Sequence, residues 1–271
     1  MSVSRFTGRC ALFALSAAYT ALVIGPVLWL ASMSLRTTAE IDLGHYALPG
    51  TFHWWKFYVA WVDSSYRVYF SNSVIVVATS VLVLVAIGGM AGYCLARYQF
   101  RGNRAIFFAL FSTIMLPPQN TVFSFFQILV EYRLFNTLAG LIIVYIGIQL
   151  PLTVYILESF FIRIPQELFD AARLDGYSDF SIFWRIAFPI AVPAVVTVVI
   201  INFILLWNEF LYAVVLITDD EKRTLPLGVY KFMGDQFSDI GMVATGAMIS
   251  IIPVLIAYAF FSEKIIQGMS G

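Results

Sequence analysis

The chain has 271 residues, of which 61% are hydrophobic and only 12% are charged, and its formal net charge at pH 7 is zero. Soluble domains carry about 25% charged residues, so this composition excludes a chain whose whole surface lies in water. The neutral balance also gives no reason to expect a nucleic-acid partner. We therefore expect an all-α integral membrane protein with one transmembrane domain over residues 1–271, because helices satisfy their own backbone polar groups in lipid.

Six runs of 23 to 29 residues contain no Asp, Glu, Lys or Arg. A helix needs about 20 mostly apolar residues to span a bilayer. Six transmembrane helices are therefore predicted, at approximately 11–33, 71–95, 105–129, 137–160, 190–214 and 240–262. A cleaved signal sequence has an apolar core of about 7–15 residues, so we interpret the longer first run as a retained helix.

Local features distinguish the first loop and the second and third predicted helices. The loop at 34–70 contains "LPGTFHWWKFYVAW", whose tryptophans and tyrosines are typical of a membrane interface. The stretch "GGMAGYCLA" at 88–96 is rich in small residues, which let helices approach each other closely. Pro117 and Pro118 are predicted to kink or break the third helix.

The distribution of basic residues predicts the orientation in the membrane. The loop "ARYQFRGNR" at 96–104 has three arginines and no acid, whereas the loop at 218–239 mixes its bases with five acids. We therefore place both termini in the cytoplasm. The charged segment at 163–189, which separates the fourth and fifth helices, is then cytoplasmic as well.

The charged segment 163–189 has the pattern of two short helices joined at a glycine. Pro165 suits a first helical turn, and Glu167 and Asp170 place negative charge near the positive end of the helix dipole. Gly176 can end this helix in a left-handed conformation. From these properties alone, an ordinary amphipathic helix in the membrane interface remains an equal alternative.

Several chemical activities are not supported by the sequence. It contains no GxxxxGK[ST] phosphate loop, so we expect no ATP hydrolysis by this chain. His45 and His53 lie in one loop without further metal ligands, and we predict neither a metal site nor a catalytic group. The apolar runs lack the buried charges expected of a proton-driven carrier. The chain therefore has the features of a membrane path whose energy comes from elsewhere.

The charged segment resembles the EAA loop of bacterial ABC-importer permeases. In that loop, EAA is separated from a Gly by three residues, the Gly is separated from an Ile by nine residues, and the Ile is separated from Leu-Pro by one residue. The matching positions in this chain are Asp170, Ala171, Ala172, Gly176, Ile186, Phe188 and Pro189. Asp replaces the usual Glu and Phe the usual Leu. The stretches "LDG", "FWRI", "WNEFLYAVVL", "FSNSVIV" and "GYCLARYQFRG" are similar to the carbohydrate-uptake, maltose-importer type of permease.

This resemblance implies a type I ABC importer permease subunit in a bacterial or archaeal inner or plasma membrane, importing a sugar or oligosaccharide by alternating access. It implies a second permease subunit, two cytoplasmic ATP-binding subunits that hold ATP and Mg, and an extracytoplasmic solute-binding lipoprotein. No cofactor is expected on this chain itself. The residues expected to couple to the ATPase are Glu167, Asp170, Ala171, Ala172, Arg173, Asp175, Gly176, Ile186 and Pro189, with Ala171 and Ala172 permitting close docking.

Polar and aromatic residues near mid-membrane are candidates for the substrate path. They are Gln119, Asn120, Asn202, Trp207, Asn208 and Glu209. Each has a structural alternative, because a polar residue in a bundle often bonds a neighbouring helix and an aromatic residue often anchors the interface. For the whole chain, the alternatives are the same architecture importing glycerol-phosphate, a polyol, an amino acid or a peptide, a stand-alone secondary carrier or channel, and a membrane-embedded enzyme.

Overall fold

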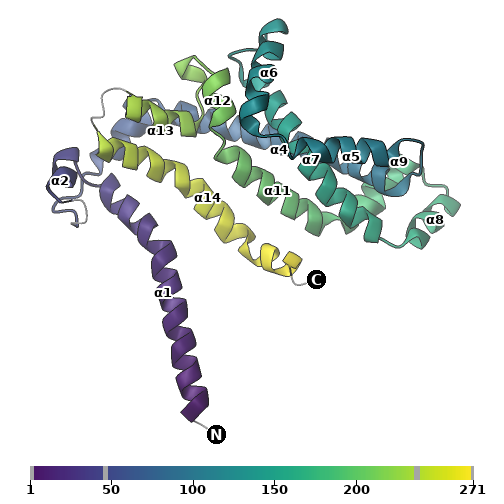
Figure 1. Ribbon diagram of the computed structural model, residues 1–271, viewed down its shortest axis with the longest axis horizontal. Helices are drawn as coiled ribbons and strands as arrows, with labels where there is room; N and C mark the ends of the chain where they lie inside the picture. Colours follow the sequence, from purple (N-terminus) through teal and green to yellow (C-terminus); the bar gives the residue numbers. More distant parts are fainter. Residues whose placement is uncertain (1–2, 45–47, 235–238, 270–271) are drawn as a thin grey trace. The chain divides into compact units, whose positions relative to one another are not determined.

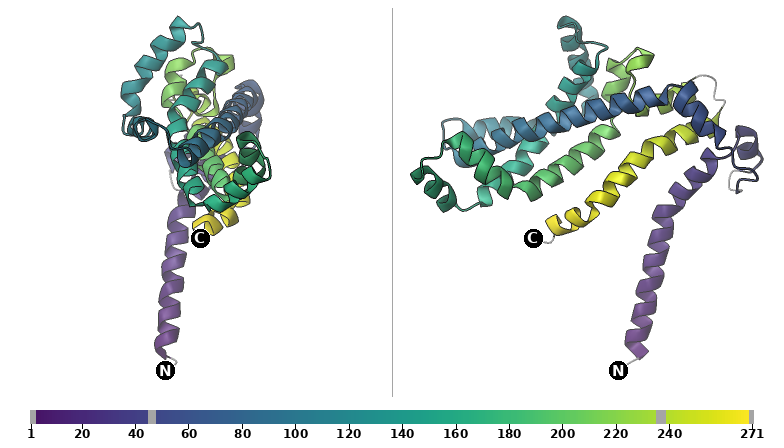
Figure 2. Two further views of the ribbon diagram at one scale, coloured as in Figure 1. Left: turned by 90° about the vertical axis from the view of Figure 1, so that its right-hand side faces the viewer. Right: turned by 180° about the vertical axis from the view of Figure 1, so that it is seen from behind.

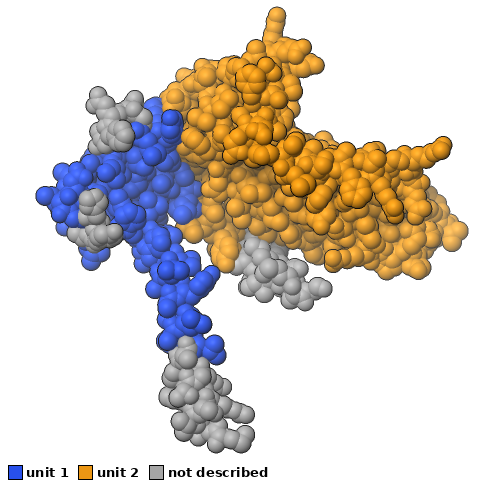
Figure 3. Space-filling model, in the orientation of Figure 1, with its two compact units in different colours: residues 1–67, 228–252 blue, residues 68–227, 253–271 orange. Residues whose placement is uncertain are grey.

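The computed structural model describes residues 3–44, 48–234 and 239–269. The parts of the predicted outer loops at 45–47 and 235–238, and both ends of the predicted domain, lie outside these residues. Every regular element in the described ranges is helical and none is a strand, which confirms the all-α prediction (Figure 1). The chain divides into two compact units, Met1–Arg67 with Gly228–Ile252 and Val68–Leu227 with Pro253–Gly271 (Figure 3).

Four helices in the described part of the chain contain apolar stretches long enough to cross a membrane. They are α1 (Val3–Ser34), α4 (Tyr66–Arg97), α7 (Leu138–Arg163) and α14 (Ile240–Met269). Two further candidates are bent pairs. One joins α5 (Asn103–Thr113) to α6 (Pro118–Glu131) at 103°, and the other joins Asp179–Ile190 to α11 (Val192–Trp207) at 77°. If each pair is one span, the described residues hold six, in the chain order expected from the sequence.

The bend between α5 and α6 follows from the two adjacent prolines. Pro117 is the N-cap of α6 and has an extended backbone, with φ −61° and ψ 131°. A residue that precedes proline is disfavoured in the helical region, so Pro118 prevents α5 from continuing through Pro117. Pro118 itself suits the first position of α6, where its missing N–H has no helical partner.

The fifth predicted span, expected as one helix at 190–214, is interrupted in the structure. α11 ends at Trp207, and α12 (Leu211–Leu216) begins after residues 208–210. The carboxylate of Glu209 accepts hydrogen bonds from the backbone N–H groups of Tyr212 at 2.8 Å and Ala213 at 3.2 Å. A side-chain acceptor for the first free N–H groups favours a new helix start, which hydrophobicity alone does not reveal.

The second unit is built around α7, which runs alongside α11 (Figures 1 and 2). Small residues on α4 allow it to approach α7 closely. A Cβ atom added to Gly92 would lie 3.0 Å from the backbone nitrogen of Glu158, and one added to Gly88 would collide with the side chain of Thr153. The glycines of "GGMAGYCLA" therefore serve the close helix packing expected from the sequence.

The first unit joins the segment after α1 to the beginning of α14. It contains the short elements α2 (Thr38–Leu43), α3 (Trp55–Tyr58) and the π-helix η1 (Val59–Asp63). The buried ammonium of Lys56 donates to the carbonyl of Arg36 at 2.6 Å, and the hydroxyl of Thr245 donates to the carbonyl of Ser34 at 3.0 Å. Between α12 and α14 the chain forms the 3₁₀ turn η3 (Asp220–Lys222) and α13 (Leu225–Gly234).

Candidate functional site

The charged segment begins with α8, which covers Gln166–Leu174. Pro165 is the N-cap, with φ −55° and ψ 137°, so it lies immediately before the helix rather than inside its first turn. The amide of Gln166 donates to the carboxylate of Asp170 at 3.0 Å. Proline before the first turn ends α7 abruptly, because the residue before it must be extended.

A Schellman motif at Gly176 ends α8. The N–H of Gly176 donates to the carbonyl of Arg173 at 3.0 Å, and the N–H of Tyr177 donates to the carbonyl of Ala172 at 3.1 Å. Gly176 has a φ of +85°, and a Cβ atom there would meet no other atom within 4 Å. Glycine is therefore required for its backbone conformation and not for space.

The second half of the segment is also helical, as the sequence predicts. α9 (Asp179–Ile182) is capped by Ser178, whose hydroxyl accepts from the N–H of Ser181. The chain continues through the π-helix η2 (Phe183–Ala187) and α10 (Phe188–Ile190) into α11. Ile186 is half-buried in this stretch, and Pro189 is exposed in the first turn of α10.

The inner face of α8 rests on an apolar core of the same unit. Phe169 and Ala172 are 1% and 5% exposed. The other buried members of this core, called here the α8 seat, are Tyr93, Leu157, Phe161, Ile164, Ile182, Phe183, Ala187, Ala191, Ala194 and Val198. The Tyr93 ring lies 6.0 Å from that of Phe169 and 5.3 Å from that of Phe183, centroid to centroid. The α8 seat thus joins α8 to the ends of α4, α7 and α11.

Arg97, the last residue of α4, reinforces this joint with hydrogen bonds. Its guanidinium donates to the carbonyls of Phe161 and Ile164 at the end of α7, and to the side chain of Gln166 at 3.2 Å. Its central carbon lies 4.2 Å from the centroid of the Phe169 ring. A cation at a helix C-terminus satisfies free carbonyls and complements the helix dipole.

The outer face of α8 is exposed and mixes apolar with acidic side chains. Leu168 is 46% exposed and Leu174 is 90% exposed, and Ala171 lies on the same exposed side. The acidic residues of this helix and its turn, all exposed, are Glu167, Asp170 and Asp175. An exposed leucine beside carboxylates on a short, firmly seated helix is suited to contact a second protein.

Arg173 connects the two helices across the glycine turn. Its guanidinium lies 3.4 Å from the carboxylate of Asp170 and 3.3 Å from that of Asp179. All three side chains are well exposed, so each ion pair contributes at most about 1 kcal/mol. The pairs orient the turn more than they stabilise the fold.

The structure separates the two alanines of the EAA-like pattern. Ala171 faces outward, whereas Ala172 belongs to the α8 seat. Ala172 therefore lies on the buried inner face of α8 and not on its exposed outer face. This differs from the expectation that Ala171 and Ala172 both permit close docking. Its small size matters because the helix packs closely on the aromatic rings beneath it. The coupling role of the segment remains a prediction.

Among the substrate-path candidates, Asn202 is the most deeply buried. Its side chain is 1% exposed. Its amide donates to the hydroxyl of Thr153 on α7 at 2.9 Å and to the carbonyl of Val198 at 3.0 Å. Asn202 thus joins α11 to α7, as expected for a polar residue that bonds a neighbouring helix.

The other candidates on this span lie at the break between α11 and α12. Glu209 is half-buried and accepts a hydrogen bond from the hydroxyl of Tyr145 at 2.7 Å, besides starting α12. The amide of Asn208, which is exposed, donates to the carbonyl of Ile204 at 2.8 Å. Trp207 is buried, and its ring stacks on Phe203 with centroids 5.4 Å apart.

Gln119 and Asn120 lie at the beginning of α6, and both are exposed. The break beside them is tied to α12 by a short hydrogen bond between the hydroxyls of Thr121 and Tyr212, whose oxygens are 2.6 Å apart. Two interrupted spans therefore meet through polar side chains, which satisfies groups that a continuous helix would not expose. None of the described His, Cys, Asp and Glu residues form a group of three or more that could hold a metal ion.

Three residues that contribute to these contacts, Tyr93, Arg97 and Tyr145, are not among the site residues predicted from the sequence. Tyr93 and Arg97 belong to the quoted stretch "GYCLARYQFRG", but their roles depend on helices more than sixty residues away in the chain. Tyr145 bonds a residue sixty-four positions away. A tyrosine or arginine at the end of an apolar run is usually an interface anchor, so the local pattern carried no signal for these contacts.

Comparison with known proteins is consistent with this geometry. A family model described as the binding-protein-dependent transport system inner membrane component matches residues 85–263. The diacetylchitobiose uptake system permease protein NgcG of Streptomyces coelicolor is 34% identical over 93% of this chain and 84% of its own length. The trehalose transport system permease protein SugB of Mycobacterium tuberculosis is 32% identical over 92% of this chain and 93% of its own.

Two solved structures share the fold. A chain of a bacterial ABC transporter involved in the import of the acidic polysaccharide alginate superimposes with a TM-score of 0.81 and 22% identity, covering 97% of this chain and 98% of that chain. A chain of the bacterial alginate ABC transporter in complex with an alginate pentasaccharide-bound periplasmic protein has a TM-score of 0.71 and 13% identity, covering 98% of both chains.

Proposed function

The chain belongs to the family of binding-protein-dependent transport system inner membrane components, and on this premise we propose that it is a multi-pass permease subunit of an ATP-driven importer for a sugar or oligosaccharide. The named relatives support the substrate class, because diacetylchitobiose and trehalose are both oligosaccharides. The partners would be a second permease subunit, two cytoplasmic ATP-binding subunits and an extracytoplasmic solute-binding protein.

ATP and Mg would be bound by the partner subunits and not by this chain. The sequence has no GxxxxGK[ST] phosphate loop. The free energy of ATP hydrolysis must then enter through a mechanical contact. Both termini and α8 would lie on the cytoplasmic side, where the ATP-binding subunits are.

The observation that carries this proposal is the construction of α8. Its outer face is exposed, while its inner face is held by the α8 seat, which includes residues from α4, α7 and α11. A force applied to such a helix is transmitted to three membrane helices and is not absorbed by a flexible loop. Closure of the ATPase dimer could then bias the bundle between its inward-open and outward-open states.

Reconstitution of the complete transporter tests this function. The proteoliposomes contain the permease pair, the ATPases and the solute-binding protein. They are expected to take up an oligosaccharide only when ATP is present on the side of the membrane where the ATP-binding subunits lie. A panel of di- and oligosaccharides, glycerol-phosphate, a polyol, an amino acid and a peptide identifies the substrate class. Uptake without ATP would indicate a secondary carrier, and uptake of none of the sugars would contradict the proposed class.

A further inference from the structure

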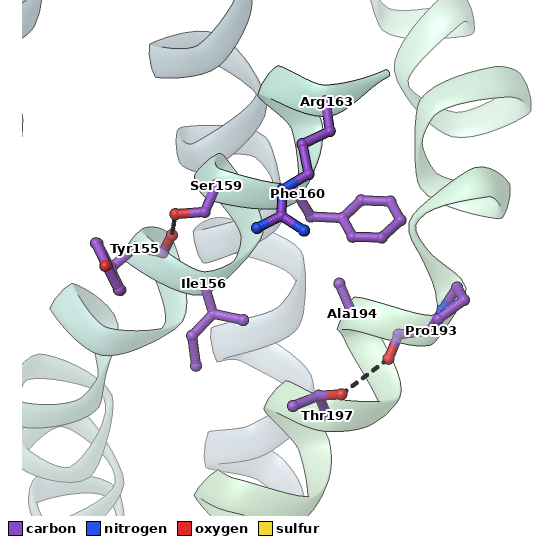
Figure 4. Close-up of a pocket in the computed structure, with 8 residues that line it drawn as sticks. All are labelled: Tyr155, Ile156, Ser159, Phe160, Arg163, Pro193, Ala194 and Thr197. Atoms are coloured by element: carbon purple, nitrogen blue, oxygen red, sulfur yellow. Dashed lines mark hydrogen bonds between the residues drawn. The ribbon is translucent and has the colours of Figure 1, made fainter. Parts of the chain in front are cut away.

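A groove lies between α7 and α11, close to the point where α7 ends (Figure 4). Its volume is about 370 Å³. The lining residues are Tyr155, Ile156, Ser159, Phe160, Arg163, Pro193, Ala194 and Thr197. The proposed function does not use this groove, since the substrate-path candidates and the outer face of α8 contribute no residue to it.

The wall of the groove carries three hydroxyls, those of Tyr155, Ser159 and Thr197, and the last two are engaged by backbone carbonyls. The Ser159 hydroxyl donates to the carbonyl of Tyr155 at 2.8 Å, and the Thr197 hydroxyl donates to the carbonyl of Pro193 at 3.0 Å (Figure 4). Both donors are thus used within their own helices. A sugar needs several convergent polar groups to replace its bonds to water, so this wall suits an apolar occupant better.

The mouth of the groove carries one cation and no acidic side chain. Arg163 is the last residue of α7, and its exposed side chain extends over the groove beside Phe160 (Figure 4). Its guanidinium makes no hydrogen bond or ion pair with any residue that the structure describes. None of the eight lining residues is Asp or Glu. A free guanidinium above an apolar wall is complementary to an anion that carries an apolar tail.

We propose that this groove binds an anionic phospholipid, with its phosphate on Arg163 and one acyl chain between α7 and α11. A guanidinium presents a planar pair of donors that matches a phosphate group. Arg163 follows directly after an apolar span, which is the level of the lipid headgroups. The inference rests on the proposed function only in assigning this end of the bundle to the cytoplasmic leaflet, whose anionic lipids attract basic residues.

The bound lipid would contact the same elements that hold α8. Ala194 both lines the groove and belongs to the α8 seat, and Ile164, the residue after Arg163, is buried in that seat. An occupant that binds only the packed arrangement of α7 and α11 stabilises that arrangement by mass action. Lipid in the groove is therefore expected to stiffen the support on which α8 transmits force.

Photolabelling of the full-length chain, coexpressed with its transporter subunits, tests the proposal. The complex is placed in nanodiscs of equal parts phosphatidylethanolamine and phosphatidylglycerol, with a trace of phosphatidylglycerol that carries a photoreactive acyl chain. Label is expected on residues 155–163 and 193–197. Arg163→Gln should reduce this label about fivefold, because one basic contact near the lipid surface is worth about that factor.

Two matched variants separate charge from fit. Arg101→Gln removes another exposed arginine from outside the groove, and it should leave the label unchanged. Thr197→Trp fills the groove while Arg163 stays in place, and it should reduce the label. Equal labelling of the wild type and Arg163→Gln would overturn the proposal, as would labelling that a photoreactive phosphatidylcholine reproduces in full.

A second arm distinguishes lipid from protein as the occupant. A photoreactive amino acid at position 197 is expected to form lipid adducts, whereas a crosslink to another subunit would show that protein covers the groove and would overturn the proposal. Neither readout depends on transport. A transporter that fails to import sugar could still give the lipid label, so the failure of one proposal is distinguishable from the failure of the other.

Discussion

The guanidinium carbon of Arg97 lies 4.2 Å from the centroid of the Phe169 ring, and it thereby connects the end of α4 to the inner face of α8. The same guanidinium donates to carbonyls at the end of α7. One side chain therefore links α4, to which it belongs, with α7 and α8, and these three elements must move together if α8 transmits force. A cation above an aromatic face contributes about 0.5–2 kcal/mol, and hydrogen bonds from a charged donor add to it.

Replacing Arg97 by Ala is expected to uncouple the ATPase from transport. Loss of a charged hydrogen-bond donor costs about 1.5–3 kcal/mol, so coupled uptake should fall roughly tenfold or more while the ATPase retains its basal rate. Uptake and ATP hydrolysis are measured in the same proteoliposomes. Arg97→Lys is the matched control, because it keeps the charge but loses the planar donors, and it should be intermediate. Normal uptake by Arg97→Ala would refute the role of this residue.

Gly176 allows a test of the turn that is independent of packing. Gly176→Asn should preserve coupling, because Asn tolerates a positive φ, whereas Gly176→Glu should abolish sugar-stimulated ATP hydrolysis and leave membrane insertion intact. A Cβ atom meets nothing within 4 Å at this position, so a loss of coupling cannot come from a clash within the chain. Normal transport by Gly176→Glu would contradict the docking of this segment.

Much of the architecture is predictable because the membrane imposes simple rules. Charge-free runs identify the apolar segments, and Pro117 with Pro118 identifies the break in the third span. The resemblance of residues 170–189 to importer permeases is confirmed by the family match and by the shared fold. These features are local in sequence, and local patterns are what composition, periodicity and motif spacing report.

The features that were not predictable depend on distant contacts. The fifth span is interrupted because Glu209 satisfies two N–H groups of α12, yet the run around it is hydrophobic enough for a continuous helix. Ala171 and Ala172 are adjacent in sequence, but Ala171 is exposed and Ala172 is buried, because α8 packs with Phe169 against Tyr93. The sequence indicates that a helix forms there, but not which of its faces is covered.

Asn202 is expected to affect stability and not sugar preference. Asn202→Ala and Thr153→Val should each destabilise the complex, and the double variant should be less destabilised than the sum, with a coupling of about 0.6 kcal/mol. Thermal unfolding in detergent and sugar uptake are measured for all four proteins. A change in the KM for sugar with unaltered unfolding would instead indicate that Asn202 contacts the substrate.

Lys56 predicts a pH dependence for the first unit. Burial lowers the pKa of Lys56 to about 8 from an ordinary 10.5. Between these values the unfolded chain binds more protons than the folded chain, so this group makes stability rise as pH increases. The unfolding temperature of the wild type relative to Lys56→Met should therefore increase across this interval. Lys222 pairs with Asp219 at 2.8 Å, and Lys222→Met serves as the control variant. If the unfolding temperatures of the wild type and Lys56→Met changed in parallel with pH, the effect would be excluded.

Site-specific photocrosslinking on α8 tests the central claim, that the outer face of this helix docks on the ATPase while the inner face holds the permease. A photoreactive residue is introduced at Ala171 or at Ala172 in the assembled transporter. The position of Ala171 is predicted to crosslink to the ATP-binding subunit, and that of Ala172 only within the permease chain. Absence of an ATPase crosslink at Ala171, or equal ATPase crosslinks at both positions, would contradict this account.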